Sequence, residues 1–342
     1  MFHPRPCGCK GQRTCLVCEA EYGAPSIADS WITEEDKKKS YVYCPLCHLA
    51  WPGWESDGWK SHPHHEGESI KFPGLKIFLD FLTEEEEQQL MIHIDEIPWD
   101  LSQSGRRKQN YGPKCNFKKR KVRTENFCGY PACTKFIQDR FKSLDILKNF
   151  QTVEQCSLEY TVERGASIDP HIDDCWIWGE RIPTVNFLAD CTLTLKRFSG
   201  PKTKYNLQDM KTYPSVVTDK GTVRDKEELA AEMDTLLKSK NEKNHLNSSY
   251  VERDAGPLQS VNFVRLPMPR RSLLVFYGPP RYEWEHGILR EDIKSRRVCI
   301  TYRELTPTYL SYGPNAEVGE QILKVSEEFW DHVKFYNLDV NR

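Results

Sequence analysis

Apolar and polar residues alternate along several short segments of the chain, which is the pattern of half-buried β-strands. Cys156, Leu158 and Tyr160 alternate with polar neighbours. Three more segments have the length and composition of strands: 185–195, 273–277 and 298–302. Glycine and proline follow the apolar run that ends at Tyr277. Many short strands separated by such turns predict a mainly β protein, built as a sandwich or a jelly roll.

Helical patterns flank these strands. Thr83 lies three residues before Glu86, which is the spacing of a capping box, and apolar residues recur at helical spacing from Leu90 to Ile97. Residues 317–336 have an amphipathic pattern, which predicts a C-terminal helix packed on the core.

Between Ser199 and Asp254 the chain becomes polar and rich in lysine. Residues 226–237 have a helical pattern, and the rest holds few large apolar side chains. We expect a surface insertion that is partly disordered. Around it we expect a head of residues 1–65, a β domain of residues 66–305 and a helical tail of residues 306–342.

Composition limits the class of protein. The 342 residues are 38% hydrophobic with a net charge of −2, so the overall charge neither favours nor excludes a nucleic-acid partner. No apolar run approaches the roughly 20 residues that span a bilayer, and the first residues lack the apolar core of a signal peptide. We therefore expect a protein of the cytoplasm and nucleus with no membrane partner, whose 13 cysteines are free thiols or metal ligands.

The head is rich in residues that bind zinc. Four cysteines lie close enough in sequence to hold one tetrahedral zinc ion: Cys7, Cys9, Cys15 and Cys18. Cys44 and Cys47, followed by His48, offer a second half-site. This half-site could pair with Cys15 and Cys18 as a zinc ribbon, or with one of His62, His64 and His65. An iron–sulfur cluster and a set of free thiols remain alternatives.

His171-Ile172-Asp173 and the distant His286 supply two imidazoles and one carboxylate. This is the ligand set of non-haem Fe(II) oxygenases, in which three protein ligands leave open positions for oxygen and a bidentate co-substrate. Because a lone His-x-Asp is common by chance, the hypothesis depends on the residues that follow His286.

Those residues resemble a known family. Residues 297–303, Arg-Val-Cys-Ile-Thr-Tyr-Arg, are similar to the Arg-x-Asn-x-Thr-Phe-Arg strand that follows the distal iron ligand in AlkB-type dioxygenases. The departures, Cys299 and Tyr302, fall on no ligand position. Further segments resemble one branch of this family, so that the resemblance covers nearly the whole chain outside the insertion: 7–15, 101–109, 168–171 and 178–181.

The resemblance implies a double-stranded β-helix (jelly-roll) core and an enzyme that uses Fe(II), 2-oxoglutarate and O2. Iron would be held by His171, Asp173 and His286. Arg297 would bind the far carboxylate of 2-oxoglutarate, because a guanidinium offers a planar pair of donors. Arg303 would face the same way, nearer the iron. A salt bridge on a sheet face is the alternative for these arginines, although their even spacing on an apolar strand favours the pocket.

Other residues are expected around the co-substrate and the substrate. Tyr160 matches the family tyrosine that hydrogen-bonds the co-substrate. Asp174, Trp176 and Trp178 either line the substrate side or belong to the core and to the surroundings of the metal ligands.

A basic stretch, 106–123, lies where AlkB-type enzymes place the lid over the substrate. Arg106, Arg107 and Tyr111 are its candidate substrate-side residues. Such a lid can bind nucleic acid through phosphate contacts and stacking, or an acidic protein surface, and a solvated loop is the alternative.

The resembling branch implies an oxidative demethylase and is linked with removal of a monomethyl group from an actin lysine. Methyladenine in DNA has also been attached to it. We predict a protein substrate, actin or another methylated protein, with release of formaldehyde and succinate. N6-methyladenine in nucleic acid is the sibling alternative, and a non-catalytic zinc-binding scaffold is the alternative from another class.

Overall fold

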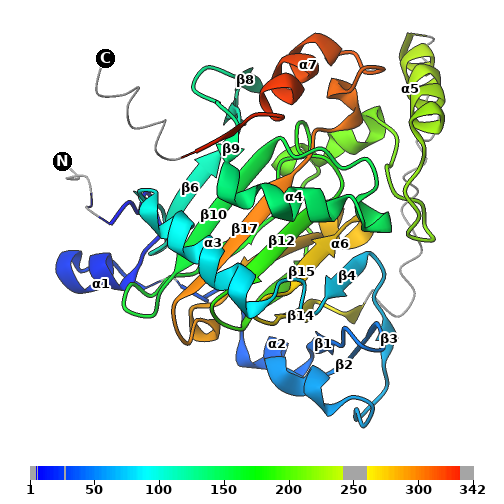
Figure 1. The fold of residues 1–342 in the computed structure, drawn as a ribbon. Coiled ribbons are helices and arrows are strands. Elements are labelled where there is room, and N and C mark those ends of the chain that lie inside the picture. The colour runs from blue at the N-terminus through cyan, green and yellow to red at the C-terminus, as the bar shows by residue number, and fades with distance from the viewer. Residues whose placement is uncertain (1–4, 6, 27, 242–259, 332–342) are drawn as a thin grey trace, which may run out of the picture.

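The computed structural model describes residues 5, 7–26, 28–241 and 260–331. Two seven-stranded sheets carry the fold, which confirms the mainly β jelly-roll prediction (Figure 1). In spatial order, the first sheet contains β11 (Ile168–His171), β16 (Trp284–Ile288), β13 (Cys191–Arg197), β14 (Phe263–Met268), β1 (Tyr41–Tyr43), β2 (Leu49–Pro52) and β3 (Ile70–Lys71). The second contains β4 (Leu75–Phe78), β15 (Leu273–Phe276), β12 (Ile182–Phe187), β17 (Arg297–Arg303), β10 (Glu154–Tyr160), β6 (Arg107–Tyr111) and β5 (Asp100–Leu101).

Strand β17 shows how the sequence pattern sets the two faces of the second sheet. Val298 and Ile300 pack into the cluster that the helices cover, whereas Cys299 packs between the two sheets. Because successive side chains alternate between faces, Arg297 and Arg303 share the inner face with Cys299. The predicted common direction of the two arginines is therefore confirmed.

Helices cover the outer face of the second sheet. α3 (Glu84–Glu96) and α4 (Lys135–Phe141) lie across it in Figure 1. Thr83 caps α3 in a capping box with Glu86, as predicted, and Leu90 is buried against the sheet. Burial of one such side chain contributes roughly 1.5–3 kcal/mol. Short 3-10 helices complete this part of the chain: η2 (Ala132–Thr134) and η3 (Asp145–Leu147).

The insertion is more ordered than its composition predicts. It contains η4 (Lys204–Thr212) and α5 (Lys226–Asn241), so the helical prediction for 226–237 is confirmed. Leu207, Tyr213 and Met233 are buried and pack against Ile172 and Cys175, beside the His-x-Asp motif. A few well-placed apolar side chains are sufficient to dock it, and most of its other side chains are exposed or half-buried, so the segment lies at the surface, as expected, with residues 204–212 and 226–241 helical. Residues 242–254 lie outside the described part of the chain.

The C-terminal helix is shorter than predicted. α7 (Ala316–Val325) ends at a cap where the Ser326 hydroxyl bonds the carbonyl of Ile322. β18 (Phe329–Trp330) then pairs with β9 (Tyr130–Pro131), so strand pairing replaces the last helical turns that the periodicity indicated. The end of the predicted helix, 332–336, lies outside the described residues.

The head joins the first sheet. β1 pairs in parallel with β14, and β2 and β3 extend the sheet beyond it. The remaining short elements are α1 (Leu16–Tyr22), α2 (Glu34–Lys38), η1 (Ser56–Ser61), α6 (Gly278–Tyr282), η6 (Arg290–Asp292), η7 (Pro307–Tyr309) and the hairpin of β7 (Lys114–Asn116) and β8 (Lys121–Arg123).

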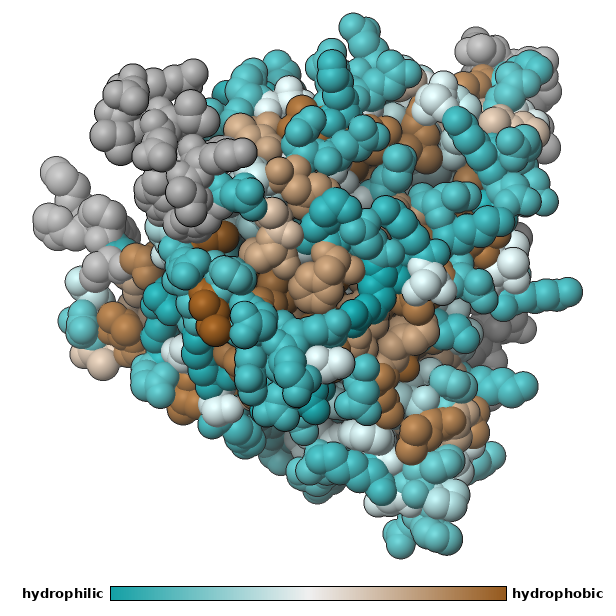
Figure 2. All heavy atoms as spheres, in the orientation of Figure 1, coloured by the Kyte–Doolittle hydropathy of each residue, from teal (hydrophilic) through white to brown (hydrophobic). Residues whose placement is uncertain are grey.

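Hydrophilic side chains predominate on the face shown in Figure 2, and apolar side chains gather there in small groups between them. Among the described residues, no helix has the length and apolar character needed to cross a membrane.

Candidate active site

Sheet pairing brings the three candidate iron ligands together. β11 and β16 are antiparallel neighbours in which His171 lies directly opposite His286. Their ring centroids are 4.2 Å apart. Asp173 follows two residues later, and one ligand atom from each of the three residues lies within 4.8 Å of the others. Nδ1 of His171 lies 2.9 Å from the carbonyl oxygen of Asp169, which leaves Nε2 to bind a metal.

The carboxylate of Asp173 is held by one oxygen. Its Oδ1 accepts a hydrogen bond of 2.8 Å from Nη2 of Arg303. Its Oδ2 is buried and has no hydrogen-bond partner among the described residues. Burial is the largest single influence and would raise the pKa of Asp173, but the positively charged groups around it, Arg303 first and Arg281 among them, together hold the pKa below its usual range. An ionised carboxylate with one oxygen to spare fits a metal ligand.

Both histidines are held in the neutral form. Burial is the main cause that lowers the pKa of His171, and it lowers the pKa of His286 well below the usual value. A neutral imidazole is the form that binds a metal ion. The three residues therefore fit an iron ion in charge and in geometry.

Arg281 holds the loop that carries Asp173 and was not singled out by the sequence. It is fully buried. Its guanidinium donates to the backbone carbonyls of Asp173 at 2.8 Å, Trp178 at 2.9 Å and Gly179 at 3.0 Å. The sequence indicated this role only by placing a charged residue between the apolar strands β15 and β16. Such an indication is weak, because most arginines lie on protein surfaces.

A second group of residues between the sheets fits a carboxylate. The Arg297 guanidinium lies 4.9 Å above the ring of Tyr160, and its Nε donates to Oδ1 of Asn186 at 2.7 Å. Arg106 lies 6.0 Å above the same ring. Nη1 of Arg297 and Nη1 of Arg106 are buried without a partner among the described residues. Two guanidinium groups thus lie over the ring of one tyrosine, each with a donor that has no partner among the described residues. Such a pair of donors suits the far carboxylate of 2-oxoglutarate.

Arg303 connects this region to the metal ligands. It pairs with Glu154 as well as with Asp173, and its guanidinium lies 5.8 Å from the ring centre of Trp178. Its Nε has no partner among the described residues. The predicted position of Arg303 nearer the iron side agrees with its contact to Asp173.

The basic stretch divides between the two faces of the second sheet. Arg107 pairs with Glu159 beneath α3, so it points away from the metal ligands. Tyr111 packs edge-on against Trp330, at a ring-centroid distance of 5.8 Å. Lys108 and Asn110 alternate with Arg107 and Tyr111 along β6. They therefore point to the inner face, as do the residues that pair with them on β10. Of the three lid residues that the sequence singled out, the structure brings only Arg106 to Tyr160.

The residues after Asp173 lie under the insertion. Oδ1 of Asp174 accepts a bond of 2.9 Å from Asn206 of η4. Trp176 is buried beneath Arg120, whose guanidinium lies 6.0 Å from the ring centre and pairs with Asp209 of η4. Trp178 is buried in the same cluster as Trp176. η4 thus contacts both the His-x-Asp loop and the β7–β8 hairpin, which the sequence did not indicate.

Among its described residues, the head contains two separate groups of metal-binding side chains. Sγ atoms of Cys7, Cys9, Cys15 and Cys18 lie within 4.8 Å of one another, and all four residues are buried. The second group is formed by Cys44, Cys47, His62 and His65 within the same limit. The arrangement as a ribbon of Cys15 and Cys18 with Cys44 and Cys47 is therefore wrong. His64 is exposed and outside the second group.

Comparison with known proteins identifies the family. No family model matches the chain. Human alpha-ketoglutarate-dependent dioxygenase alkB homolog 4 is 37% identical over 325 residues, covering 95% of this chain and 94% of that protein. The mouse protein of the same name is 38% identical over 323 residues, covering 94% of each. A Caenorhabditis elegans protein named DNA N6-methyl adenine demethylase is 30% identical over 336 residues, covering 93% of this chain and 94% of the relative.

The ligand set and the two-sheet fold are those of an Fe(II)- and 2-oxoglutarate-dependent dioxygenase, 2-oxoglutarate being alpha-ketoglutarate. The chain belongs to the AlkB family of these enzymes, and the alkB homolog 4 proteins align with nearly all of it. A solved structure, that of OsALKBH1, aligns with a TM-score of 0.37 and 9% identity over 69% of this chain and 98% of the other, a likeness too low to identify a shared fold.

Proposed function

We propose that this dioxygenase is an oxidative N-demethylase and that its substrate is a monomethylated lysine of a protein, with actin as the first candidate. The single observation that supports the chemistry is the triad of His171, Asp173 and His286, in which Oδ2 of Asp173 has no hydrogen-bond partner within the described part of the chain. The worm relative, named as a demethylase, supports the reaction type.

The residues present fit both groups that the family requires. Iron would bind at the triad, and 2-oxoglutarate would bind with its far carboxylate at Arg297, Tyr160 and Arg106. Bound together with O2, they supply the oxidant that hydroxylates a methyl group on nitrogen, after which the carbon leaves as formaldehyde. Arg303 fixes one oxygen of Asp173 so that the other remains available, and Arg281 fixes the backbone of the same residue.

Two side chains next to the triad favour an ammonium substrate. Asp174 follows the metal-binding carboxylate and accepts hydrogen bonds from Asn206. The buried ring of Trp176 carries the guanidinium of Arg120, whose place a methylated ammonium ion would take. A carboxylate and an aromatic face are the groups that recognise methylated ammonium ions. The exposed basic side chains of the β7–β8 hairpin would then dock an acidic surface of the substrate protein.

A second candidate substrate is N6-methyladenine in nucleic acid. The hairpin presents Lys118, Lys119 and Lys121 beside Phe117, an aromatic side chain that is 46% exposed. Exposed cations around an exposed aromatic ring suit a phosphate backbone with a stacked base. The name of the worm relative points the same way.

The experiment that separates these candidates is succinate release by protein loaded with Fe(II) under anaerobic conditions and then given 2-oxoglutarate and O2. A monomethyl-lysine actin peptide and an N6-methyladenine oligonucleotide are compared, each with its unmethylated control. We expect the methylated peptide to stimulate turnover in the wild type and not in Asp173→Ala. Stimulation by the oligonucleotide alone would replace the lysine substrate with the nucleic-acid one.

We also propose that the four buried cysteines Cys7, Cys9, Cys15 and Cys18 hold one structural zinc ion. Such a zinc would hold Arg13 of the same segment in place, and Arg13 donates to Oδ2 of Asp169 at 2.9 Å, two residues before His171. Zinc content that survives purification and falls in Cys15→Ser would support it; unchanged zinc content in that variant would contradict it. Residence in the cytoplasm and nucleus stays a prediction, tested by imaging of the tagged protein.

A further inference from the structure

The second group of metal-binding side chains in the head, Cys44, Cys47, His62 and His65, lies apart from the active site. One ligand atom from each of these four residues lies within 4.8 Å of the others. Neither the demethylase chemistry nor the cluster of four cysteines uses them. Their geometry therefore requires an explanation of its own.

The two cysteines are brought together by a tight hairpin turn. β1 ends at Tyr43 and β2 begins at Leu49, and the backbone N–H of Cys44 donates to the carbonyl of Leu49 at 2.8 Å. The N–H of His48 donates back to the carbonyl of Cys44 at 2.9 Å, and His48 has a left-handed φ of 61°. The turn folds Cys47 back over Cys44, and Nε1 of Trp51 donates to Sγ of Cys47 at 3.4 Å. A sulfur that accepts an N–H is stabilised as the thiolate, which is the form that binds a metal.

The two histidines lie in the segment that follows η1. The ring of Trp51 stacks on His65 with centroids 4.7 Å apart and an interplanar angle of 24°. The rings of His62 and His65 are 5.6 Å apart. Nδ1 of His62 and Nε2 of His65 are both buried and have no hydrogen-bond partner among the described residues. A buried imidazole nitrogen without a partner is costly in free energy, and coordination of a metal ion would satisfy both atoms.

We infer that Cys44, Cys47, His62 and His65 form a second zinc site of the Cys2His2 type. Two thiolates and two imidazoles are the ligands that select a tetrahedral zinc ion. Four protein ligands leave no open coordination position, so the site is structural and not catalytic. The inference rests on the four side chains alone and is independent of the proposed demethylase substrate.

The zinc ion would fix the part of the head that docks on the jelly roll. Trp54 lies in the chain between the cysteine and histidine ligands, and its ring is 3.9 Å from the guanidinium of Arg265 on β14. Arg265 in turn makes a buried ion pair with Asp292 at 2.7 Å. Closing the loop from Cys47 to His62 through a metal ion would hold Trp54 in this position.

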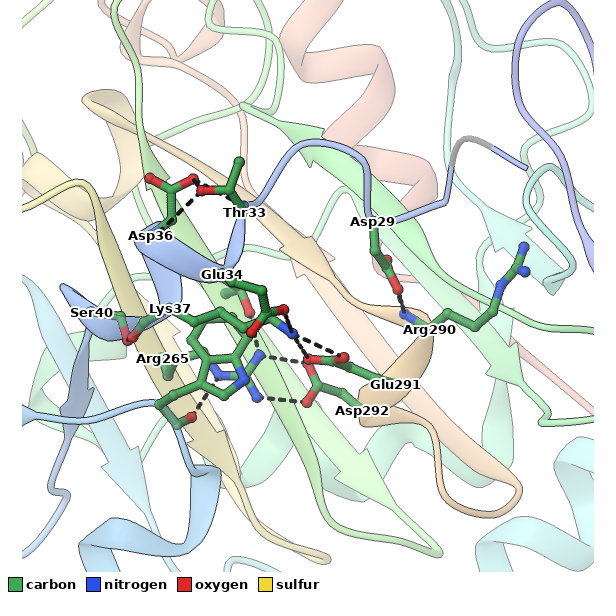
Figure 3. Close-up of polar contacts among 12 residues, drawn as sticks. Asp29, Thr33, Glu34, Asp36, Lys37, Ser40, Arg265, Arg290, Glu291 and Asp292 are labelled. Atoms are coloured by element: carbon green, nitrogen blue, oxygen red, sulfur yellow. Dashed lines mark hydrogen bonds and ion pairs between the residues drawn. The ribbon is translucent and has the colours of Figure 1, made fainter. Parts of the chain in front are cut away.

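Figure 3 shows the rest of this docking surface, where Lys37 reaches toward Glu34 and Glu291 and the carboxylate of Asp29 meets the backbone N–H of Arg290. The head thus contacts the 290–292 turn, which directly follows the strand of His286, through several polar groups. The proposed zinc ion would stabilise this contact by fixing the loop that carries Trp54.

The test measures zinc per chain in full-length protein purified without added metal and then loaded with iron. The variants are the double substitution His62→Asn with His65→Gln, and the matched control His64→Gln, which changes an exposed histidine of the same segment. We expect the double variant to contain about one zinc per chain less than the wild type and the control to lose none. His65→Cys supplies another zinc ligand in place of the imidazole, so this single variant should keep the wild-type zinc content. Equal zinc content in the double variant and the wild type would overturn the inference.

A second measurement does not depend on any variant folding. X-ray absorption at the zinc edge of the iron-loaded wild type should show imidazole nitrogen in addition to sulfur around zinc, with about three sulfur atoms and one nitrogen on average if both head sites are filled. A spectrum with sulfur as the only ligand, or wild-type protein without zinc, would contradict the second site.

Discussion

Replacement of Arg297 by lysine tests the co-substrate pocket most sharply. Arg297 is fully buried, its Nε is bonded to Asn186, and its Nη1 has no partner among the described residues. Lysine keeps the charge but lacks the planar pair of donors, so it cannot bond Asn186 and bind both carboxylate oxygens. A hydrogen bond to a charged group contributes roughly 1.5–3 kcal/mol. The loss of one such bond corresponds to about a 10- to 150-fold weaker affinity for 2-oxoglutarate.

The assay is succinate release at varied 2-oxoglutarate and saturating methylated substrate. We expect KM for 2-oxoglutarate to rise by that factor, while KM for the methylated substrate and the iron content stay at wild-type values. Arg140→Lys, on α4 at the outer face of the second sheet, is the matched control and should leave both KM values unchanged. A KM for 2-oxoglutarate within about threefold of the wild type in Arg297→Lys would refute the assigned role, because loss of a hydrogen bond from a buried guanidinium to the co-substrate should weaken binding by more than that factor.

Three further outcomes are expected. Arg281→Met should lower the free energy of unfolding by roughly 3 kcal/mol or more, because three buried carbonyls each lose a hydrogen-bond donor at a cost of about 1–3 kcal/mol. The variant should also retain iron less well. A denaturation midpoint equal to that of the wild type would contradict this. Burial opposes ionisation of Glu159, but two arginines hold its pKa below the usual value, so its contribution to stability is present at neutral pH and is lost as the pH falls through that lowered pKa. The stability difference between wild type and Glu159→Gln, followed by urea denaturation, should therefore shrink from about pH 6 to pH 3, and a difference that grows toward acid would be inconsistent. Glutamine at Lys118, Lys119 and Lys121 should raise KM for the methylated macromolecule about tenfold at low salt and less at high salt, with KM for 2-oxoglutarate unchanged; an unaltered macromolecular KM would place the hairpin outside the substrate contact.

The metal triad was accessible from the sequence because its signal is local at each position. His-x-Asp is contiguous, and the two-arginine strand after His286 has a distinctive spacing. Strand alternation also gave the common direction of Arg297 and Arg303, since a side-chain period of two needs no tertiary knowledge. What the sequence lacked was the register that sets His171 opposite His286.

The lid residues show where such reasoning ends. Arg106 and Arg107 are adjacent and chemically identical, and only the pairing of β6 with β10 decides that Arg107 meets Glu159 on the helix side. A shift of one residue would exchange their roles. The sequence therefore predicted a basic lid but not which basic side chains face inward.

Long-range packing accounts for the remaining gaps. Arg281 bonds three backbone carbonyls and the sulfur of Cys175, all about a hundred residues away in sequence, and a backbone carbonyl is a partner that has no sequence signature. The insertion has a polar composition, yet Leu207, Tyr213 and Met233 are enough to dock it beside Ile172. The average composition of a segment does not reveal a few isolated apolar side chains that pack against the core.

The central claim is that the triad binds the iron ion at which 2-oxoglutarate and O2 are consumed. The most direct measurement is iron-dependent succinate release from 2-oxoglutarate by anaerobically reconstituted protein, compared between the wild type and Asp173→Ala with the methylated actin peptide present. The account predicts one bound iron and peptide-stimulated succinate release in the wild type, and loss of both in the variant. Equal iron binding and equal turnover in the two proteins would contradict it.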